Sequence, residues 1–126
     1  MSVRVLVVED QFMIALDISQ QLTEVGFEVV GPAPSVAKAL RLVEEAGCDV
    51  AVLDVNLGSE TSEPIASRLR ACGKPFVVLT GYSTDNLRPW FHDATILTKP
   101  SHIADLIAAL RKCACLAGNS KCSAAL

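Results

Sequence analysis

Four short hydrophobic runs in this sequence each stop at a residue that could do chemistry. The runs cover residues 3–8, 50–53, 76–79 and 94–98. The residues that follow them are, in chain order, Glu9 with Asp10, Asp54, Thr80 and Lys99. Three carboxylates, a hydroxyl and an ammonium group can together hold a hard divalent cation and a phosphoryl group.

If the fold brings the three carboxylates together, they predict phosphoryl transfer assisted by a metal ion. Their negative charges would repel one another, and Mg²⁺ removes that repulsion because it prefers carboxylate, carbonyl and water oxygens as ligands. A carboxylate that attacks phosphorus forms an acyl phosphate. Thr80 would donate a hydrogen bond to one phosphoryl oxygen, and Lys99 would neutralise another.

A polar residue at the end of a single strand is ordinary, because strands commonly run into polar loops. The complete set, in this order, favours a functional site over a chance series of loop residues. Pro100 supports this reading, since a proline keeps the residue before it in an extended conformation and so directs Lys99 toward the strand ends.

The hydrophobic runs alternate with amphipathic stretches, which predicts strands that alternate with helices. Helices are expected over residues 12–25, 36–46 and 63–72 and from Ser101 onward, and a further strand over Phe27–Val30. Gly26, Gly47 and Gly73 are expected to stop the first three helices, and Ser35 and Ser62 can cap two of them.

This alternation predicts an α/β fold with a parallel five-stranded sheet, helices on both faces and right-handed crossovers. In such sheets ligands bind beyond the carboxyl ends of the strands, which is the edge where the polar residues fall. The helix between Thr80 and Lys99, fourth of five, is expected to be short or irregular because loop formers fill that stretch.

Length and composition limit the classes to which the chain can belong. At 126 residues it is long enough for one domain with a single core. The net charge of −3 and the lack of a basic stripe argue against a nucleic-acid partner. No apolar run approaches a membrane span and no signal peptide precedes the first strand, so a cytoplasmic location without a membrane partner is expected.

The domain limits and the cysteines complete these expectations. Residues 1–115 are expected to form the domain, and residues 116–126 a flexible tail.

Cys48 and Cys72 sit beside apolar residues and are expected to pack as small hydrophobic side chains. The three cysteines nearest the C-terminus lack a nearby fourth ligand, which argues against a metal site there.

Four motifs resemble those of the receiver domain of bacterial two-component response regulators. In chain order they are Val-Val-Glu-Asp, Leu-Asp-Val-Asn-Leu, Leu-Thr-Gly-Tyr and Thr-Lys-Pro. The resemblance covers residues 3 to about 114 and implies a flavodoxin-like, doubly wound (βα)5 three-layer sandwich with strand order 2-1-3-4-5. It also implies a histidine kinase as the phosphodonor and an output partner that is a protein.

The same resemblance assigns a role to each site residue. Asp54 matches the phosphoacceptor, Glu9 and Asp10 match the acidic pair that places Mg²⁺, and the backbone carbonyl of Asn56 matches a further metal ligand. Thr80 matches the hydroxyl that follows the phosphoryl group, and Lys99 the cation beside it. A stand-alone receiver of this kind assists its own phosphorylation and dephosphorylation and signals by protein binding or acts as a phosphate sink, without a turnover substrate.

The sequence departs from the usual receiver pattern at the position three residues before Lys99. An aromatic switch residue is usual there, and this chain has Ile96. The stretch between Thr80 and Lys99 is also shorter than usual by about one helical turn. Because Ile96 cannot act as an aromatic switch, residues 81–94 are expected to rearrange on phosphorylation, with Gly81, Tyr82 and Trp90 in the readout.

The residues Thr80-Gly81-Tyr82-Ser83 are similar to those of the subgroup called FAT GUY receivers, although Val78-Leu79 replaces its Phe-Ala. That subgroup is associated with histidine kinases of the HWE or a related type. The resemblance therefore implies a kinase of this type as the donor.

Two other functions fit part of the pattern. A haloacid-dehalogenase-like phosphohydrolase also uses a strand-end aspartate and Mg²⁺, but position 56 would then be aspartate rather than Asn56, and Glu9-Asp10 would have no role. A degenerate, unphosphorylated receiver would lack one or more of the site residues, and this sequence keeps them all.

Overall fold

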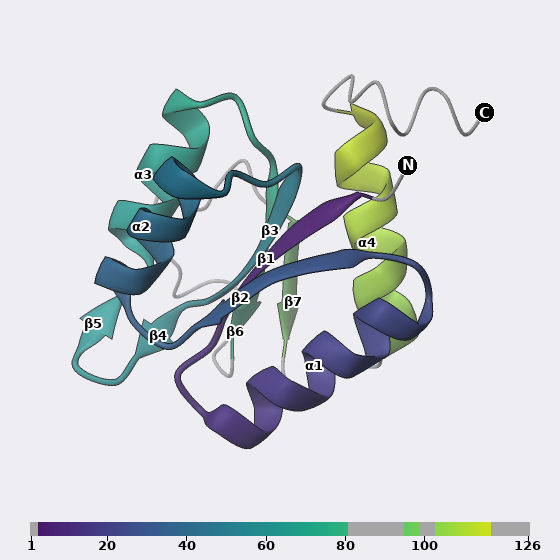
Figure 1. Cartoon of the computed structure of the whole chain (residues 1–126), viewed down its shortest axis with the longest axis horizontal. Coiled ribbons are helices and arrows are strands. Elements are labelled where there is room, and N and C mark those ends of the chain that lie inside the picture. Colours follow the sequence, from purple (N-terminus) through teal and green to yellow (C-terminus); the bar gives the residue numbers. More distant parts are fainter. Residues whose placement is uncertain (1–2, 81–94, 99–102, 117–126) are drawn as a thin grey trace.

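The computed structural model describes residues 3–80, 95–98 and 103–116, and its centre is a five-stranded parallel sheet (Figure 1). The strands are β1 (Arg4–Val8), β2 (Glu28–Ala33), β3 (Val50–Asp54), β6 (Phe76–Thr80) and β7 (Thr95–Thr98), hydrogen-bonded in the order β2-β1-β3-β6-β7. Two short strands, β4 (Asn56–Leu57) and β5 (Glu60–Thr61), form a separate hairpin. Counted along the chain, the five parallel strands therefore have the expected order 2-1-3-4-5, and the flavodoxin-like fold is confirmed.

Helices cover both faces of the sheet and make a three-layer sandwich (Figure 1). They are α1 (Phe12–Glu24), α2 (Val36–Glu45), α3 (Glu63–Ala71) and α4 (Ile103–Leu116). Side chains alternate along β1, so Val5 and Val7 pack with α1 and α4, while Leu6 and Val8 pack with α2 and α3. Burial on both faces explains why these strands are hydrophobic throughout.

Helix α1 ends where the sequence predicts, at a glycine. Gly26 has a φ of 99°, which favours glycine because a Cβ is disfavoured there. The Gly26 N–H donates to the Thr23 carbonyl at 3.1 Å and the Phe27 N–H to the Leu22 carbonyl at 3.1 Å. These two bonds satisfy the last carbonyls of the helix and turn the chain into β2.

The two serines predicted to cap helices behave differently. Ser35 Oγ accepts from the Lys38 N–H at 3.2 Å, which confirms the cap of α2. Ser62 stands at the start of α3, but its side chain makes no cap bond, and its Oγ is buried without a partner among the described residues. Its backbone has φ −84° and ψ 7°, rather than the extended conformation that aims a capping side chain at the helix.

The cysteine prediction is half right. Cys48 lies in the core, where burial raises the pKa of its thiol to about 11. Cys72 is exposed, because α3 ends at Ala71 and Cys72 is the residue that caps it.

Helix α4 continues through Leu116, one residue into the predicted tail. The rest of that tail and the predicted irregular helix within residues 81–94 lie outside the described residues. No helix in the described part of the chain has the length and apolar character to cross a bilayer.

The two serine positions give a direct test of this packing. Ser35→Ala should lower the free energy of unfolding by about 1 kcal/mol, because the helix loses a cap bond. Ser62→Ala should leave it unchanged or raise it, since a buried, unpaired hydroxyl typically costs about 1–3 kcal/mol. Urea denaturation compares the two variants. A loss in Ser62→Ala as large as that in Ser35→Ala would contradict the different environments of the two hydroxyls.

Candidate metal and phosphoryl site

The strand register brings the acidic residues to one edge of the sheet. Parallel pairing of β1 with β3 sets Val8 opposite Leu53, so Glu9 and Asp54 follow at the same level. The Glu9 N–H also donates to the Ala33 carbonyl at 3.0 Å, which fixes the end of β1 to β2. Hydrogen bonds to β2 on one side and β3 on the other thus fix the end of β1, where the acidic pair begins.

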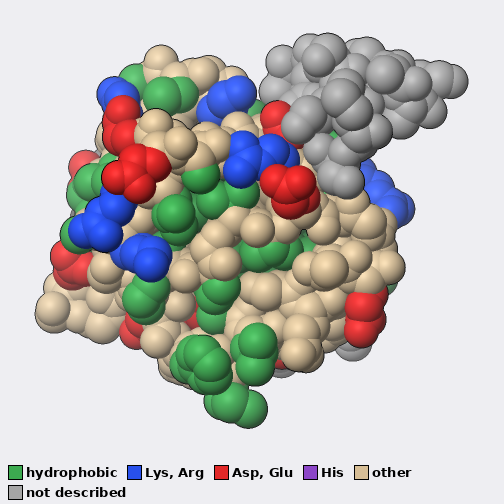
Figure 2. Space-filling model, viewed as in Figure 1, with side chains coloured by type: hydrophobic (Ala, Val, Ile, Leu, Met, Phe, Trp, Pro, Cys, Tyr) green, Lys and Arg blue, Asp and Glu red, His purple; other side chains and the backbone are tan. Residues whose placement is uncertain are grey.

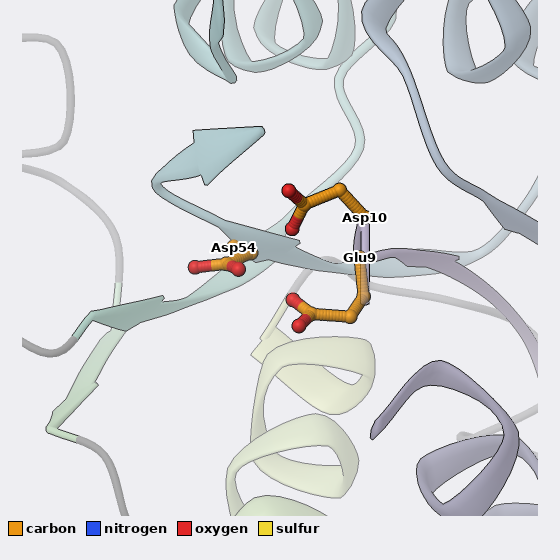
Figure 3. A group of neighbouring side chains, drawn as sticks. All are labelled: Glu9, Asp10 and Asp54. Atoms are coloured by element: carbon orange, nitrogen blue, oxygen red, sulfur yellow. The ribbon is translucent and has the colours of Figure 1, made fainter. Parts of the chain in front are cut away.

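The three carboxylates form one cluster, with Glu9 and Asp10 on either side of Asp54 (Figure 3). One oxygen of each residue lies within 4.8 Å of the corresponding oxygens of the other two. Glu9 is 2% exposed and Asp54 7% exposed, whereas Asp10 is open to solvent. Three hard oxygen donors, two of them buried, fit Mg²⁺ well, and Asp10 keeps one side of the cluster in contact with solvent.

Two further predicted residues lie at the same edge. Thr80 is the last residue of β6, the strand next to β3, and it is 1% exposed. Asn56 begins the β4–β5 hairpin two residues after Asp54. Ile96 pairs with Val78 and packs against the core on the side of α2 and α3. It is therefore a packing residue and does not belong to the carboxylate cluster.

Several residues named from the sequence cannot be placed in this site. They lie outside the described residues and are Gly81, Tyr82, Trp90 and Lys99. Their roles in phosphate binding and readout stay predictions.

The β4–β5 hairpin is the part of the site that the sequence reasoning missed. Gly58 and Ser59 form its two-residue turn, with a φ of 67° at Gly58 and no positive φ at Ser59. That pattern is typical of a type II′ hairpin, so the Gly-Ser pair could have revealed it. A Cβ added at Gly58 would lie 3.9 Å from Asp10 Oδ2, which places the turn beside the carboxylate cluster.

Helix α1 presents an unusual surface next to this cluster. Phe12 is 71% exposed and Met13 72%, and Ile14 and Leu16 are also exposed; we call these four residues the apolar start of α1. Figure 2 shows hydrophobic side chains gathered at the edge of the molecule where Figure 1 places the beginning of this helix. Ile14 lies outside the buried stripe of this helix, which runs through Ala15, Ile18 and Leu22.

Comparison with known proteins agrees with the family resemblance of the sequence motifs. A family model described as the response regulator receiver domain matches residues 5–111. The transcriptional regulatory protein PdtaR of Mycobacterium tuberculosis is 37% identical over 114 residues, which cover 85% of this chain and 54% of that protein. The chain therefore spans about half the length of the curated relatives it matches.

Solved structures agree in fold. SdrG from Sphingomonas melonis Fr1 is 40% identical, with a TM-score of 0.74 over 86% of this chain and 93% of that one. A response regulator receiver protein from Sinorhizobium medicae WSM419 is 27% identical, with a TM-score of 0.79 over 92% of this chain and 97% of that one.

Repulsion within the cluster can be measured through stability. Asp10→Asn should raise the free energy of unfolding in EDTA by about 1 kcal/mol, because one of three close negative charges is removed. Mg²⁺ should raise the melting temperature of the wild type by binding the folded state, and should have little effect on Asp10→Asn.

Thermal melts in EDTA and in Mg²⁺ provide the readout. Glu24→Gln makes the same charge change at the far end of α1 and serves as the matched control. Equal melting temperatures of the wild type with and without saturating Mg²⁺ would argue against a metal site at the carboxylates.

Proposed function

The chain belongs to the response regulator receiver domain family, and on that premise we propose that it accepts a phosphoryl group on Asp54. The observation that carries the proposal is the carboxylate cluster, in which oxygens of Asp54, Glu9 and Asp10 lie within 4.8 Å of one another. The donor in this proposal is a phosphohistidine of a histidine kinase or a phosphotransfer protein. The similarity at Thr80-Gly81-Tyr82-Ser83 favours a kinase of the HWE type.

Each residue has a separate task in this reaction. Glu9, Asp10 and Asp54, with the backbone carbonyl of Asn56, would hold Mg²⁺, which when bound neutralises charge on the phosphoryl oxygens. An Asp54 oxygen attacks phosphorus as the P–N bond to the donor imidazole breaks, and an acyl phosphate forms. Burial of Asp54 and Glu9 keeps bulk water away from the reacting carboxylate.

Thr80 and Lys99 would bind the phosphoryl group once it is on Asp54. The Thr80 hydroxyl donates a hydrogen bond to a phosphoryl oxygen, and the Lys99 ammonium pairs with another. Because the product is the modified domain itself, the chain works as a switchable binding module rather than an enzyme with a turnover substrate. The phosphorylated form then binds a protein partner or stores the phosphoryl group.

We further propose that the apolar start of α1 is the surface on which the phosphodonor docks. A donor histidine must come within bonding distance of Asp54, so the donor has to cover the surface around the cluster. Asp10 is the exposed member of that cluster, and Phe12 follows it by two residues. Exposed apolar side chains at this place suit a helical partner with an apolar surface of its own.

Labelling of Asp54 tests the central reaction. Incubation with acetyl phosphate and Mg²⁺ should give one base-labile phosphoryl adduct, detected as a mass increase of the intact protein. Asp54→Ala should remove it, because the nucleophile is gone, while Asp17→Ala on α1 should label normally. Equal labelling of Asp54→Ala and the wild type would show that the phosphoacceptor is another residue.

A comparison of two donors tests the docking surface. A Phe12→Ala/Met13→Ala double variant should slow transfer from a cognate kinase by about tenfold or more, because buried aromatic contacts carry much of an interface's affinity. Its labelling by acetyl phosphate should match the wild type, since that small donor needs no protein contact. Rapid-quench transfer with labelled kinase gives the rates.

Val25→Ala is the matched control, because Val25 is also exposed and lies at the other end of the helix. Unchanged transfer from the kinase in the double variant, or equal losses with both donors, would refute docking on this surface.

A further inference from the structure

The β4–β5 hairpin carries Asn56 but is too short to hold its own shape. Within the described residues, its strand pairs are Asn56 with Thr61 and Leu57 with Glu60. Isolated two-stranded hairpins are marginal in water even when they are longer than this. Contacts with the rest of the domain must therefore fix its position.

Contacts at its base and inner side hold part of the hairpin. Leu57 is 3% exposed and packs in the core with α2 and α3. The Ser62 N–H donates to the Val55 carbonyl at 3.0 Å and closes the base, and the Val55 N–H donates to the Leu79 carbonyl at 3.1 Å. These contacts fix the hairpin where it leaves β3 and where its outer strand enters α3, which leaves Glu60, next to the turn, farther from both points.

Glu60 ties that outer strand to a neighbouring helix. Its Oε2 accepts from the backbone N–H of Val36, the first residue of α2, at 3.4 Å. The first N–H groups of a helix have no partner within the helix, and the positive end of the helix dipole favours a carboxylate there. Ser35 caps a different amide, that of Lys38, so the two acceptors do not compete. In Figure 1 the hairpin lies beside the start of α2, as this contact requires.

We propose that Glu60 is a positioning residue for metal binding. By holding the hairpin against the start of α2, it keeps the Asn56 carbonyl and the Gly58 turn in place beside the carboxylate cluster. The turn is close enough to matter, since a Cβ at Gly58 would lie 3.9 Å from Asp10 Oδ2. The inference rests on the proposed function, because it takes the Asn56 carbonyl as a ligand of Mg²⁺.

Calorimetric titration of the full chain with Mg²⁺ tests this role. Glu60→Ala should weaken Mg²⁺ binding about fivefold, because the hydrogen bond from the Val36 N–H is lost and a typical hydrogen bond contributes about that factor. Glu60→Gln keeps an acceptor oxygen without the charge and should bind Mg²⁺ within about twofold of the wild type. Glu45→Ala removes the same charge from the other end of α2 and should bind normally.

Amide exchange supplies a readout besides affinity. In Glu60→Ala, deuterium should enter the Val36 amide and the amides of residues 56–61 faster than in the wild type, while Glu60→Gln should restore protection. Wild-type Mg²⁺ affinity in Glu60→Ala would overturn the proposal. Equal weakening in Glu60→Gln and Glu60→Ala would also overturn it, because the loss would then come from the missing charge.

The failure of this inference is distinguishable from that of the proposed function. If the wild type binds Mg²⁺ and is phosphorylated on Asp54, and Glu60→Ala binds Mg²⁺ with the same affinity, only the role of Glu60 is refuted. If the wild type binds no Mg²⁺, both the role of Glu60 and the proposed metal-assisted function are refuted.

Discussion

Three carboxylates at one sheet edge repel one another, and the fold has to overcome that repulsion. Glu9, Asp10 and Asp54 are held together by the pairing of β1 with β3, not by attraction for one another. The buried strands beneath them supply the free energy that keeps the charges close. A site strained in this way would favour a divalent cation, and that cation would reduce the repulsion between Asp54 and an anionic phosphoryl group.

Much of this arrangement can be predicted from the sequence, because parallel strands end at a common edge. The runs that lead into Glu9, Asp54 and Thr80 place those residues at a common edge once the strands are recognised, and the structure has them at that edge. Gly26 marks the end of α1 for an equally local reason, its positive φ. Periodicity and local backbone preferences carry these predictions, and neither needs knowledge of the tertiary structure.

Other features depend on packing that the sequence does not display. Ser62 has the right type and position for a cap, but the chain enters α3 from the hairpin with a backbone that turns its hydroxyl into the interior. Ile14 fits the apolar stripe of α1 by type, yet the helix is rotated so that Ala15 faces the sheet. The hairpin itself follows from local turn chemistry at Gly58, so it could have been predicted.

A crystal structure of the wild type with Mn²⁺ in place of Mg²⁺, recorded at a wavelength where manganese scatters anomalously, tests the metal site at the carboxylate cluster. One anomalous peak is expected within the cluster, about 2.1 Å from carboxylate oxygens of Glu9, Asp10 and Asp54 and from the Asn56 carbonyl. No peak within the cluster, at Mn²⁺ concentrations that occupy sites elsewhere on the protein, would contradict the metal-assisted site on which the proposed phosphorylation depends.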